Sequence, residues 1–280
     1  MDRVRCEYGQ KKVGHTGTLD PLATGVLVLC LGYATRLSSF LSDHSKSYWA
    51  RIRLGTTTDT LDSDGEVTST SGDVPQGLDA ILGVVNRYLG EIEQIPPMYS
   101  ARKVGGKKLY QLARAGKQAD RKSRSVTIHA LEVDGFEAPD LDLKVTCSKG
   151  TYIRVLADEI GRELGCGAHV TVLRRTAVGN IGLDRCKTLD ELTTLSEGGN
   201  IESALIEPNK ALASMPGLSL SGEEALRFGN GNPANTVEEG EETDRLYRAV
   251  KGNGTFLGIG RWVAEESVLK PVKVFNNANS

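Results

Sequence analysis

Residues 14–25 read Gly-His-Thr-Gly-Thr-Leu-Asp-Pro-Leu-Ala-Thr-Gly and directly precede the apolar run 26–31. Glycine permits sharp turns and close approach of the backbone, and Pro21 disfavours the helical conformation at Asp20. The stretch therefore predicts a rigid loop that presents one carboxylate next to a buried strand. It does not match a phosphate-binding P-loop, because no lysine follows the second glycine at the required spacing. In the alternative interpretation, Asp20 forms an Asx-turn and hydrogen-bonds only to its own backbone.

The chain after this loop carries the periodicities of both strands and helices. From residue 48 to residue 54, apolar residues alternate with Trp and Arg, which predicts a half-exposed strand with Tyr48 on its apolar face. Residues 151–164 place apolar side chains at helical spacing. Further strands are predicted over residues 26–31, 125–133, 141–147 and 170–173, and further helices over 35–41, 78–89, 107–114, 188–195 and 200–213.

Length and composition describe a globular chain of about two domains. The chain has 280 residues, and Pro216-Gly217 begins a glycine-rich, acidic region of short strand-like segments. We expect a boundary near residue 215 and a small β-barrel-like module over 216–280. No apolar run approaches the ~20 residues that span a bilayer, so we expect a cytoplasmic protein without a membrane partner. The five cysteines include no C-x-x-C pair, and the four histidines show no ligand spacing, which predicts no metal site.

The charge is distributed unevenly along the chain. The net charge is −2, but residues 1–180 carry +3 and residues 181–280 carry −5. Residues 102–124 hold nine Lys or Arg and one Asp. Such a basic stretch indicates a surface for a polyanion such as RNA. The alternative is a solvated loop that has no partner.

Two further side chains allow two interpretations each. Tyr48 is either a core tyrosine or an aromatic platform for a base, with a hydroxyl able to move protons. Arg154 lies in the first turn of the predicted helix, where a cation opposes the helix dipole. It forms either a surface pair with Asp158 or an ion pair with a carboxylate elsewhere in the fold. The Asp-rich run 59–65 lacks the Glu that a calcium loop requires at its twelfth position, so we interpret it as a turn.

Several stretches of the chain resemble the bacterial tRNA pseudouridine synthase B family. The resemblance is close at residues 14–25, and the matching stretches keep the family's order from residue 3 to about residue 215. The matching stretches include Lys46-Ser47-Tyr48, Gln94-Ile95-Pro96-Pro97-Met98-Tyr99-Ser100-Ala101, Thr151-Tyr152-Ile153-Arg154 and Leu173-Arg174-Arg175. The region after residue 216 is similar to the family's small RNA-binding domain.

The resemblance implies a fold and a set of site residues. The implied fold is α+β, with a mixed, mostly antiparallel sheet flanked by helices over residues 1–215 and a PUA-type domain over 216–280. The resemblance implies that Asp20 is the nucleophile and that Arg154 pairs with its carboxylate. It implies that Tyr48 stacks on the base and transfers a proton, that Tyr152 and Leu173 form walls of the base pocket, and that His15 helps to open the T-loop. It also implies a tRNA clamp over about 102–126, which includes Lys107, Lys108 and Arg114.

The resemblance also implies an activity and its alternatives. The activity is isomerisation of the T-loop uridine at position 55 of tRNA by base flipping and attack by an aspartate, without cofactor, as a monomer with no obligatory protein partner. One alternative is a non-catalytic RNA-binding or tRNA-folding protein of the same fold. Another is the relative that works inside guide-RNA particles. The family normally has a strand and a Lys-Pro-x-Gly turn upstream of residue 1, and we expect this chain to lack both.

Overall fold

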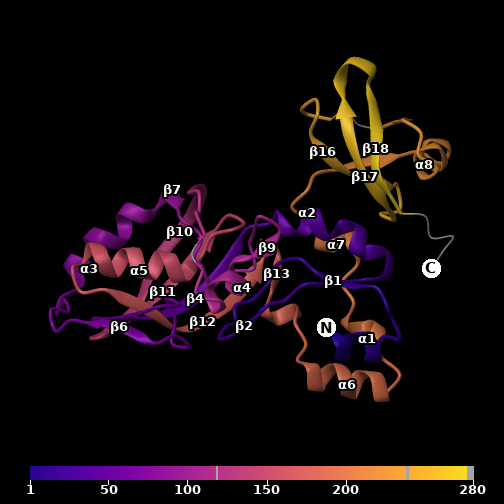
Figure 1. The fold of residues 1–280 in the computed structure, drawn as a ribbon. Helices are drawn as coiled ribbons and strands as arrows, with labels where there is room; N and C mark the ends of the chain where they lie inside the picture. Colours follow the sequence, from indigo (N-terminus) through magenta and orange to yellow (C-terminus); the bar gives the residue numbers. More distant parts are fainter. Residues whose placement is uncertain (118, 238–239, 276–280) are drawn as a thin grey trace. The chain divides into compact units, whose positions relative to one another are not determined.

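The structure, a computed structural model, describes residues 1–117, 119–237 and 240–275 (Figure 1). It contains two compact units, and each is built from separate pieces of the chain. The first comprises residues 17–28 and 42–185. The second comprises residues 1–16, 29–41 and 186–280. The loop quoted above therefore passes from one unit into the other between residues 16 and 17.

A seven-stranded sheet forms the centre of the first unit. The strands lie in the order β13-β12-β4-β11-β10-β7, and β2 pairs with β12. Their bounds are β2 (Thr24–Gly25), β4 (Lys46–Leu54), β7 (Gly90–Gln94), β10 (Arg124–Glu137), β11 (Asp140–Cys147), β12 (Ala168–Val178) and β13 (Ile181–Gly182). Every pairing in this sheet is antiparallel except that of β2 with β12. The predicted α+β class, with a mostly antiparallel sheet, is confirmed.

The core of this unit lies between the sheet and two helices. The helices are α3 (Leu78–Val85) and α5 (Ile153–Glu163), and they cover one face of the sheet (Figure 1). Ala50, Ile52 and Leu54 of β4 are buried in one cluster with Leu156 and Ile160 of α5. Each large apolar side chain buried there contributes about 1.5–3 kcal/mol. The predicted period of two in β4 and the helical period after residue 151 are thus both confirmed.

Short elements join these strands. They include β5 (Thr56–Thr58), β6 (Val67–Thr70), the 3-10 helix η2 (Asn86–Tyr88), β8 (Lys103–Val104), β9 (Lys107–Lys108), α4 (Leu109–Arg114) and the 3-10 helix η3 (Leu183–Arg185). The helix predicted over 107–114 begins two residues later than expected. The reason is the pair Gly105 and Gly106, whose φ angles of 57° and 80° fold β8 and β9 into a hairpin.

The second unit combines short helices with two small strands. Its elements before residue 215 are α1 (Asp2–Glu7), β1 (Val13–His15), β3 (Leu29–Leu31), the 3-10 helix η1 (Gly32–Leu37), α2 (Ser38–Ser42), α6 (Leu189–Glu197), the 3-10 helix η4 (Ile201–Ala204) and α7 (Pro208–Ala211). The strand predicted over 26–31 is shorter than expected, because only its last three residues pair with β1. The helix predicted over 35–41 is partly a 3-10 helix.

A five-stranded sheet with its own core forms the rest of this unit. It comprises β14 (Gly217–Leu220), β15 (Ala234–Asn235), β16 (Leu246–Lys251), β17 (Phe256–Val263) and β18 (Val268–Val274), with α8 (Gly222–Gly229) and the 3-10 helix η5 (Ala264–Glu266). The strand order is β14-β16-β17-β18-β15. Phe228, Tyr247, Trp262 and Leu269 fill the core. The strand-like segments were predicted, whereas α8 was not.

Candidate active site

The loop that carries Asp20 is attached at its C-terminal end to strand β12. Thr24 and Gly25 pair with Arg174 and Arg175 in parallel register, and the Val26 N–H donates to the Arg175 carbonyl at 2.8 Å. Gly25 has a φ of +97°, and a Cβ there would lie 2.1 Å from the Arg175 carbonyl oxygen. This position therefore requires glycine. The backbone of Gly25 thus makes the close approach that its glycine predicts, and the group it approaches is the backbone of β12.

The side chain of Arg175 holds the same loop at both of its ends. Arg175 is 2% exposed. The guanidinium donates to the carbonyl of Val26 at 2.7 Å and to the carbonyls of Gly17 and Thr18 at 3.1 and 3.3 Å. Because carbonyls on both sides of Asp20 accept from one buried cation, the loop is constrained around the carboxylate.

Arg154 connects the Asp20 loop to helix α5. Its Nε donates to Asp20 Oδ2 at 2.8 Å and its Nη2 to Asp20 Oδ1 at 3.0 Å. The Arg154 side chain is 3% exposed, whereas the Asp20 side chain is 30% exposed. The surface pair that we considered for Arg154 is instead made by Arg162, which contacts Asp158. Both Asp20 oxygens bind Arg154, so this carboxylate is not confined to an Asx-turn.

A second carboxylate shares the same guanidinium. Arg154 Nη1 lies 3.0 Å from Asp62 Oδ2 and donates to the Thr60 carbonyl at 2.8 Å, while Nη2 also donates to the Tyr99 carbonyl at 3.0 Å. An arginine has five N–H donors, and these contacts together with the two to Asp20 provide five acceptors. The Asp62 side chain is 4% exposed and also accepts from the Thr60 hydroxyl at 2.5 Å.

The arrangement has a clear chemical consequence. One buried cation faces two carboxylates, so the cluster retains a net negative charge. Asp62 is enclosed, whereas Asp20 keeps almost a third of its side-chain surface open. Asp20 is therefore the carboxylate that a substrate atom can reach, and Arg154 fixes its direction. Reasoning from the sequence missed Asp62, because one aspartate in an Asp-rich turn carries no signal of a distant partner.

Tyr48 lies on β4 directly opposite Arg175 of β12. Its ring packs against the core cluster that includes Leu173. Burial raises the pKa of the Tyr48 hydroxyl above its ordinary value, and the charge and hydrogen bond of Arg175 oppose that rise in part. The hydroxyl is therefore protonated at neutral pH.

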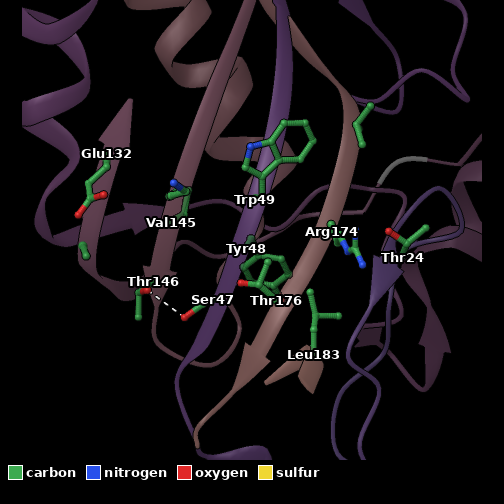
Figure 2. Close-up of a pocket in the computed structure, with 13 residues that line it drawn as sticks. Thr24, Ser47, Tyr48, Trp49, Glu132, Val145, Thr146, Arg174, Thr176 and Leu183 are labelled. Atoms are coloured by element: carbon green, nitrogen blue, oxygen red, sulfur yellow. Dashed lines mark hydrogen bonds between the residues drawn. The ribbon is translucent and has the colours of Figure 1, made fainter. Parts of the chain in front are cut away.

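A groove of about 800 Å³ opens beside Tyr48, on strands β4, β10, β11 and β12 (Figure 2). Figure 2 shows Trp49, Arg174, Thr176 and Leu183 around it, and Ser47 bonded to Thr146 at 2.9 Å. Of the predicted site residues, Tyr48 lines this groove, and Asp20 and Arg154 do not. The groove therefore does not include the carboxylate cluster.

The other predicted pocket residues also lie in the first unit. Tyr152 is half-buried and is the residue immediately before helix α5. Leu173 is 4% exposed on β12, where it pairs with Ala50. The structure thus gathers Asp20, Tyr48, Tyr152 and Leu173 on adjoining elements of one unit.

His15 and the basic residues belong to other elements of the chain. His15 is exposed at the end of β1, in the second unit. Lys107 is exposed in the β8–β9 hairpin. The side chains of Lys108 and Arg114 lie outside what the structure describes. Within residues 1–117, 119–237 and 240–275, no group of three or more His, Cys, Asp or Glu is arranged to hold a metal ion, and no helix is long and apolar enough to cross a membrane.

Solved structures share this fold over nearly the whole chain. One is a Cbf5-Nop10-Gar1 complex, whose matching chain is 26% identical with a TM-score of 0.74 and covers 98% of this chain and 79% of its own. Another is an H/ACA RNP bound to a substrate RNA containing 2'-deoxyuridine, with 24% identity, a TM-score of 0.76, and coverage of 99% and 80%. The fold thus defines the class as the Cbf5/TruB-type pseudouridine synthases.

The amino-acid sequence narrows the class to one family. Residues 5–153 match the N-terminal domain of the TruB family pseudouridylate synthases, residues 154–210 the tRNA pseudouridylate synthase B C-terminal domain, and residues 216–275 the pseudouridine synthase II TruB C-terminal domain. The tRNA pseudouridine synthase B of Dechloromonas aromatica is 46% identical over 260 residues, which are 93% of this chain and 85% of that one. That of Pseudomonas fluorescens is 44% identical over 280 residues, 99% and 90% of the two chains. The chain belongs to the TruB family of pseudouridylate synthases, and the resemblance inferred from its motifs is confirmed.

Proposed function

We propose that this protein isomerises a uridine of tRNA to pseudouridine, and that its target is the T-loop uridine at position 55. The observation that carries the proposal is the half-open carboxylate of Asp20, which the buried guanidinium of Arg154 holds through both oxygens. The curated relatives named tRNA pseudouridine synthase B support the reaction and the class of RNA.

The proposed reaction needs no external reagent. The target uridine first leaves its stack, at a cost of a few kcal/mol. Asp20 then attacks either C1' of the ribose or C6 of the base, and the bond between N1 and C1' breaks. The uracil turns in the pocket, C5 bonds to C1', and the bond to Asp20 is released. The C5 proton leaves last, to a base, and N1 takes up a proton in its place. No atom is gained or lost, so neither a metal nor a redox cofactor is required.

The other predicted residues act around that step. Arg154 orients the nucleophile, Tyr152 and Leu173 form walls of the pocket, and the ring of Tyr48 stacks on the uracil. The Tyr48 hydroxyl serves the late transfer of the C5 proton. Because its pKa is raised, this hydroxyl starts protonated and accepts only after its own proton has moved. His15 contributes to opening of the T-loop.

RNA binding is assigned to two further regions. Residues 102–126, with Lys107, Lys108 and Arg114, form a basic clamp on the phosphates. Residues 216–280 form a PUA-type module, divided from the catalytic domain near residue 215. The acidic character of that module restricts its phosphate contacts to a few cations, namely Arg245, Arg248, Lys251 and Arg261.

We also propose that the protein acts as a cytoplasmic monomer without an obligatory protein partner. The Cbf5 chain of similar fold forms a complex with Nop10 and Gar1. The need for a protein partner therefore distinguishes an enzyme that acts alone from one that acts in a complex. Turnover of a bare T-stem-loop RNA by purified protein, with the mass of a single chain in solution, supports the stand-alone mode. Turnover only after addition of other proteins would contradict it.

The nucleophile is tested by Asp20→Asn, which keeps the size of the side chain and removes its charge. We expect no pseudouridine formation in a T-stem-loop RNA, with the dissociation constant of that RNA within a few-fold of wild type. Asp73→Asn is the matched control, because Asp73 is exposed elsewhere in the same unit. Substantial turnover by the Asp20 variant would refute the assignment. Binding without turnover by the wild-type protein would favour the non-catalytic alternative.

The clamp is tested by its salt dependence. Each phosphate contact contributes about 0.7–0.9 to the slope of log affinity against log salt concentration. Changing Lys107, Lys108 and Arg114 to Gln together should flatten that slope by about two to three units. The same change at Arg87 and Arg162, exposed cations that pair with carboxylates, should leave it unaltered. An unchanged slope in the triple variant would mean that the basic stretch is a solvated loop.

A further inference from the structure

Gln94 is a fully buried amide that contacts the start of helix α5. It is the last residue of the edge strand β7 and has 0% exposure. A buried amide is costly unless its donor and acceptor are both satisfied. Here Gln94 Nε2 donates to the Tyr152 carbonyl at 3.3 Å, and the Tyr152 N–H donates to Gln94 Oε1 at 3.0 Å.

The partner of this amide is the residue at which α5 begins. Tyr152 is the N-cap of the helix, with an extended conformation (φ −104°, ψ 108°), and its side chain makes no capping hydrogen bond. Gln94 binds both backbone polar groups of this residue, as a neighbouring strand would. The two bonds therefore fix the orientation of the Tyr152 peptide groups, and with them the direction in which the Tyr152 ring leaves the backbone.

The same contact determines where the first turn of α5 lies. Arg154 stands two residues after Tyr152, and its guanidinium holds Asp20 through both oxygens. Arg154 is a cation at a helix N-terminus, where the helix dipole disfavours it, so its position depends on other contacts. Gln94 does not contact Arg154 itself, but it holds the backbone of Tyr152, two residues earlier, from a strand that is 58 residues away in the sequence.

The chain that leaves Gln94 returns to the same helix turn. Pro96 and Pro97 restrict its path, and the Tyr99 carbonyl accepts from Arg154 Nη2 at 3.0 Å. This segment leads directly into the basic stretch 102–124. The entry to that stretch is thus bonded at Gln94 to Tyr152 and at Tyr99 to Arg154.

We infer that Gln94 is a positioning residue for the reaction: its amide sets the backbone of Tyr152 and thereby the direction of Arg154 and of the Asp20 carboxylate. The inference rests on the proposed function, because it assigns Gln94 an effect on the step carried out by Asp20. It does not give Gln94 any contact with the reacting atoms.

The first test is Gln94→Met, which keeps the length of the side chain and removes both hydrogen bonds. We expect kcat for a T-stem-loop RNA to fall at least 10-fold, with the dissociation constant of the RNA within about three-fold of wild type. Gln76→Met is the matched control, because Gln76 is exposed and donates to a backbone carbonyl at 3.0 Å. Unchanged kcat in Gln94→Met would overturn the inference, and active Asp20→Asn would instead overturn the proposed function.

A second variant separates positioning from a loss of folding. In Gln94→Glu, the protonated carboxyl has one donor and one acceptor and can reproduce both bonds, whereas the ionised carboxylate can only accept. The ratio of its kcat to that of wild type should therefore rise several-fold as the pH is lowered through the pKa of the new carboxyl. In an Arg154→Lys background, Gln94→Met should add less than three-fold. A flat pH ratio together with fully additive effects would show that Gln94 is merely structural and would overturn the inference.

Discussion

Arg154 and Arg51 hold carboxylates with the same geometry in two different surroundings. Arg154 binds both oxygens of Asp20 at 2.8 and 3.0 Å, and Arg51 binds both oxygens of Asp142 at 2.7 and 2.8 Å. The side chain of Arg154 is 3% exposed, whereas that of Arg51 is 43% exposed on the sheet. The difference between the two regions is burial and the number of acceptors, since the pair geometry is shared.

The comparison distinguishes a buried ion pair, which fixes the orientation of its carboxylate, from an exposed ion pair on the surface of the sheet. Water stabilises both members of the Arg51 pair when they separate, so such pairs contribute about 0–1 kcal/mol. The guanidinium of Arg154 has lost its hydration and needs every one of its acceptors. A buried, fully bonded arginine therefore has one orientation, which is the property that a reacting carboxylate requires of its partner.

The largest effect is expected for Arg154→Met. This change leaves Asp62 as a buried carboxylate without its cation, which should lower the free energy of unfolding by about 3–5 kcal/mol. Turnover should become undetectable. Urea unfolding can be followed through Trp49 of the same unit in a Trp262→Phe background, which leaves a single tryptophan. If the free energy of unfolding of this variant equals that of wild type, burial does not make the Arg154 pair more important than the Arg51 pair.

The hydroxyl of Tyr48 should have the next largest effect. Tyr48→Phe keeps the ring and should lower kcat by about 10²–10⁴-fold, with normal RNA binding. Because the pKa of the hydroxyl is raised, the ionised fraction grows only at alkaline pH, so wild-type kcat should increase with pH there and the residual kcat of the variant should not. Equal behaviour of Phe and Leu replacements would exclude stacking, and a fully active Phe variant would exclude the proton transfer.

Asp62→Asn should have an intermediate effect. It retains the shape of the side chain but removes a charged acceptor worth about 1.5–3 kcal/mol, which corresponds to about a 10–100-fold loss of kcat if orientation of Arg154 depends on it. The affinity for RNA should not change. Asp64→Asn is the control, because Asp64 is exposed two residues away. Equal kcat in the two variants would show that Asp20 alone is enough to orient Arg154.

The smallest effect is expected on the sheet surface. Arg51→Gln should lower the free energy of unfolding by less than about 1 kcal/mol, and by still less at high salt, because exposed pairs are screened. A double-mutant cycle with Asp142→Asn isolates the energy of the pair. A coupling above about 2 kcal/mol would mean that burial is not what distinguishes Arg51 from Arg154.

Local signals in the sequence were sufficient for much of the fold. The alternation over 48–54 predicted the buried face of β4, and helical spacing predicted α5, because both patterns arise from side chains a few residues apart. The hairpin at 103–108 was missed although Gly105-Gly106 carries its signal. Helix α8 was missed in a region where glycine and acidic residues obscured its apolar face.

The amino-acid sequence by itself determined the family, the α+β class and the Asp20 loop, because short motifs and local periodicity encode them. Only the tertiary structure showed that Asp62 contacts Arg154, that Gln94 contacts Tyr152 and that Arg175 contacts the Asp20 loop. Their partners are distant in sequence: Gln94 lies 58 residues from Tyr152, and Arg175 lies 149 residues from Val26. An isolated Asp, Gln or Arg looks the same in a turn, at a strand end or on a surface. What these side chains do is decided by burial, since the loss of water requires each polar atom to find a protein partner.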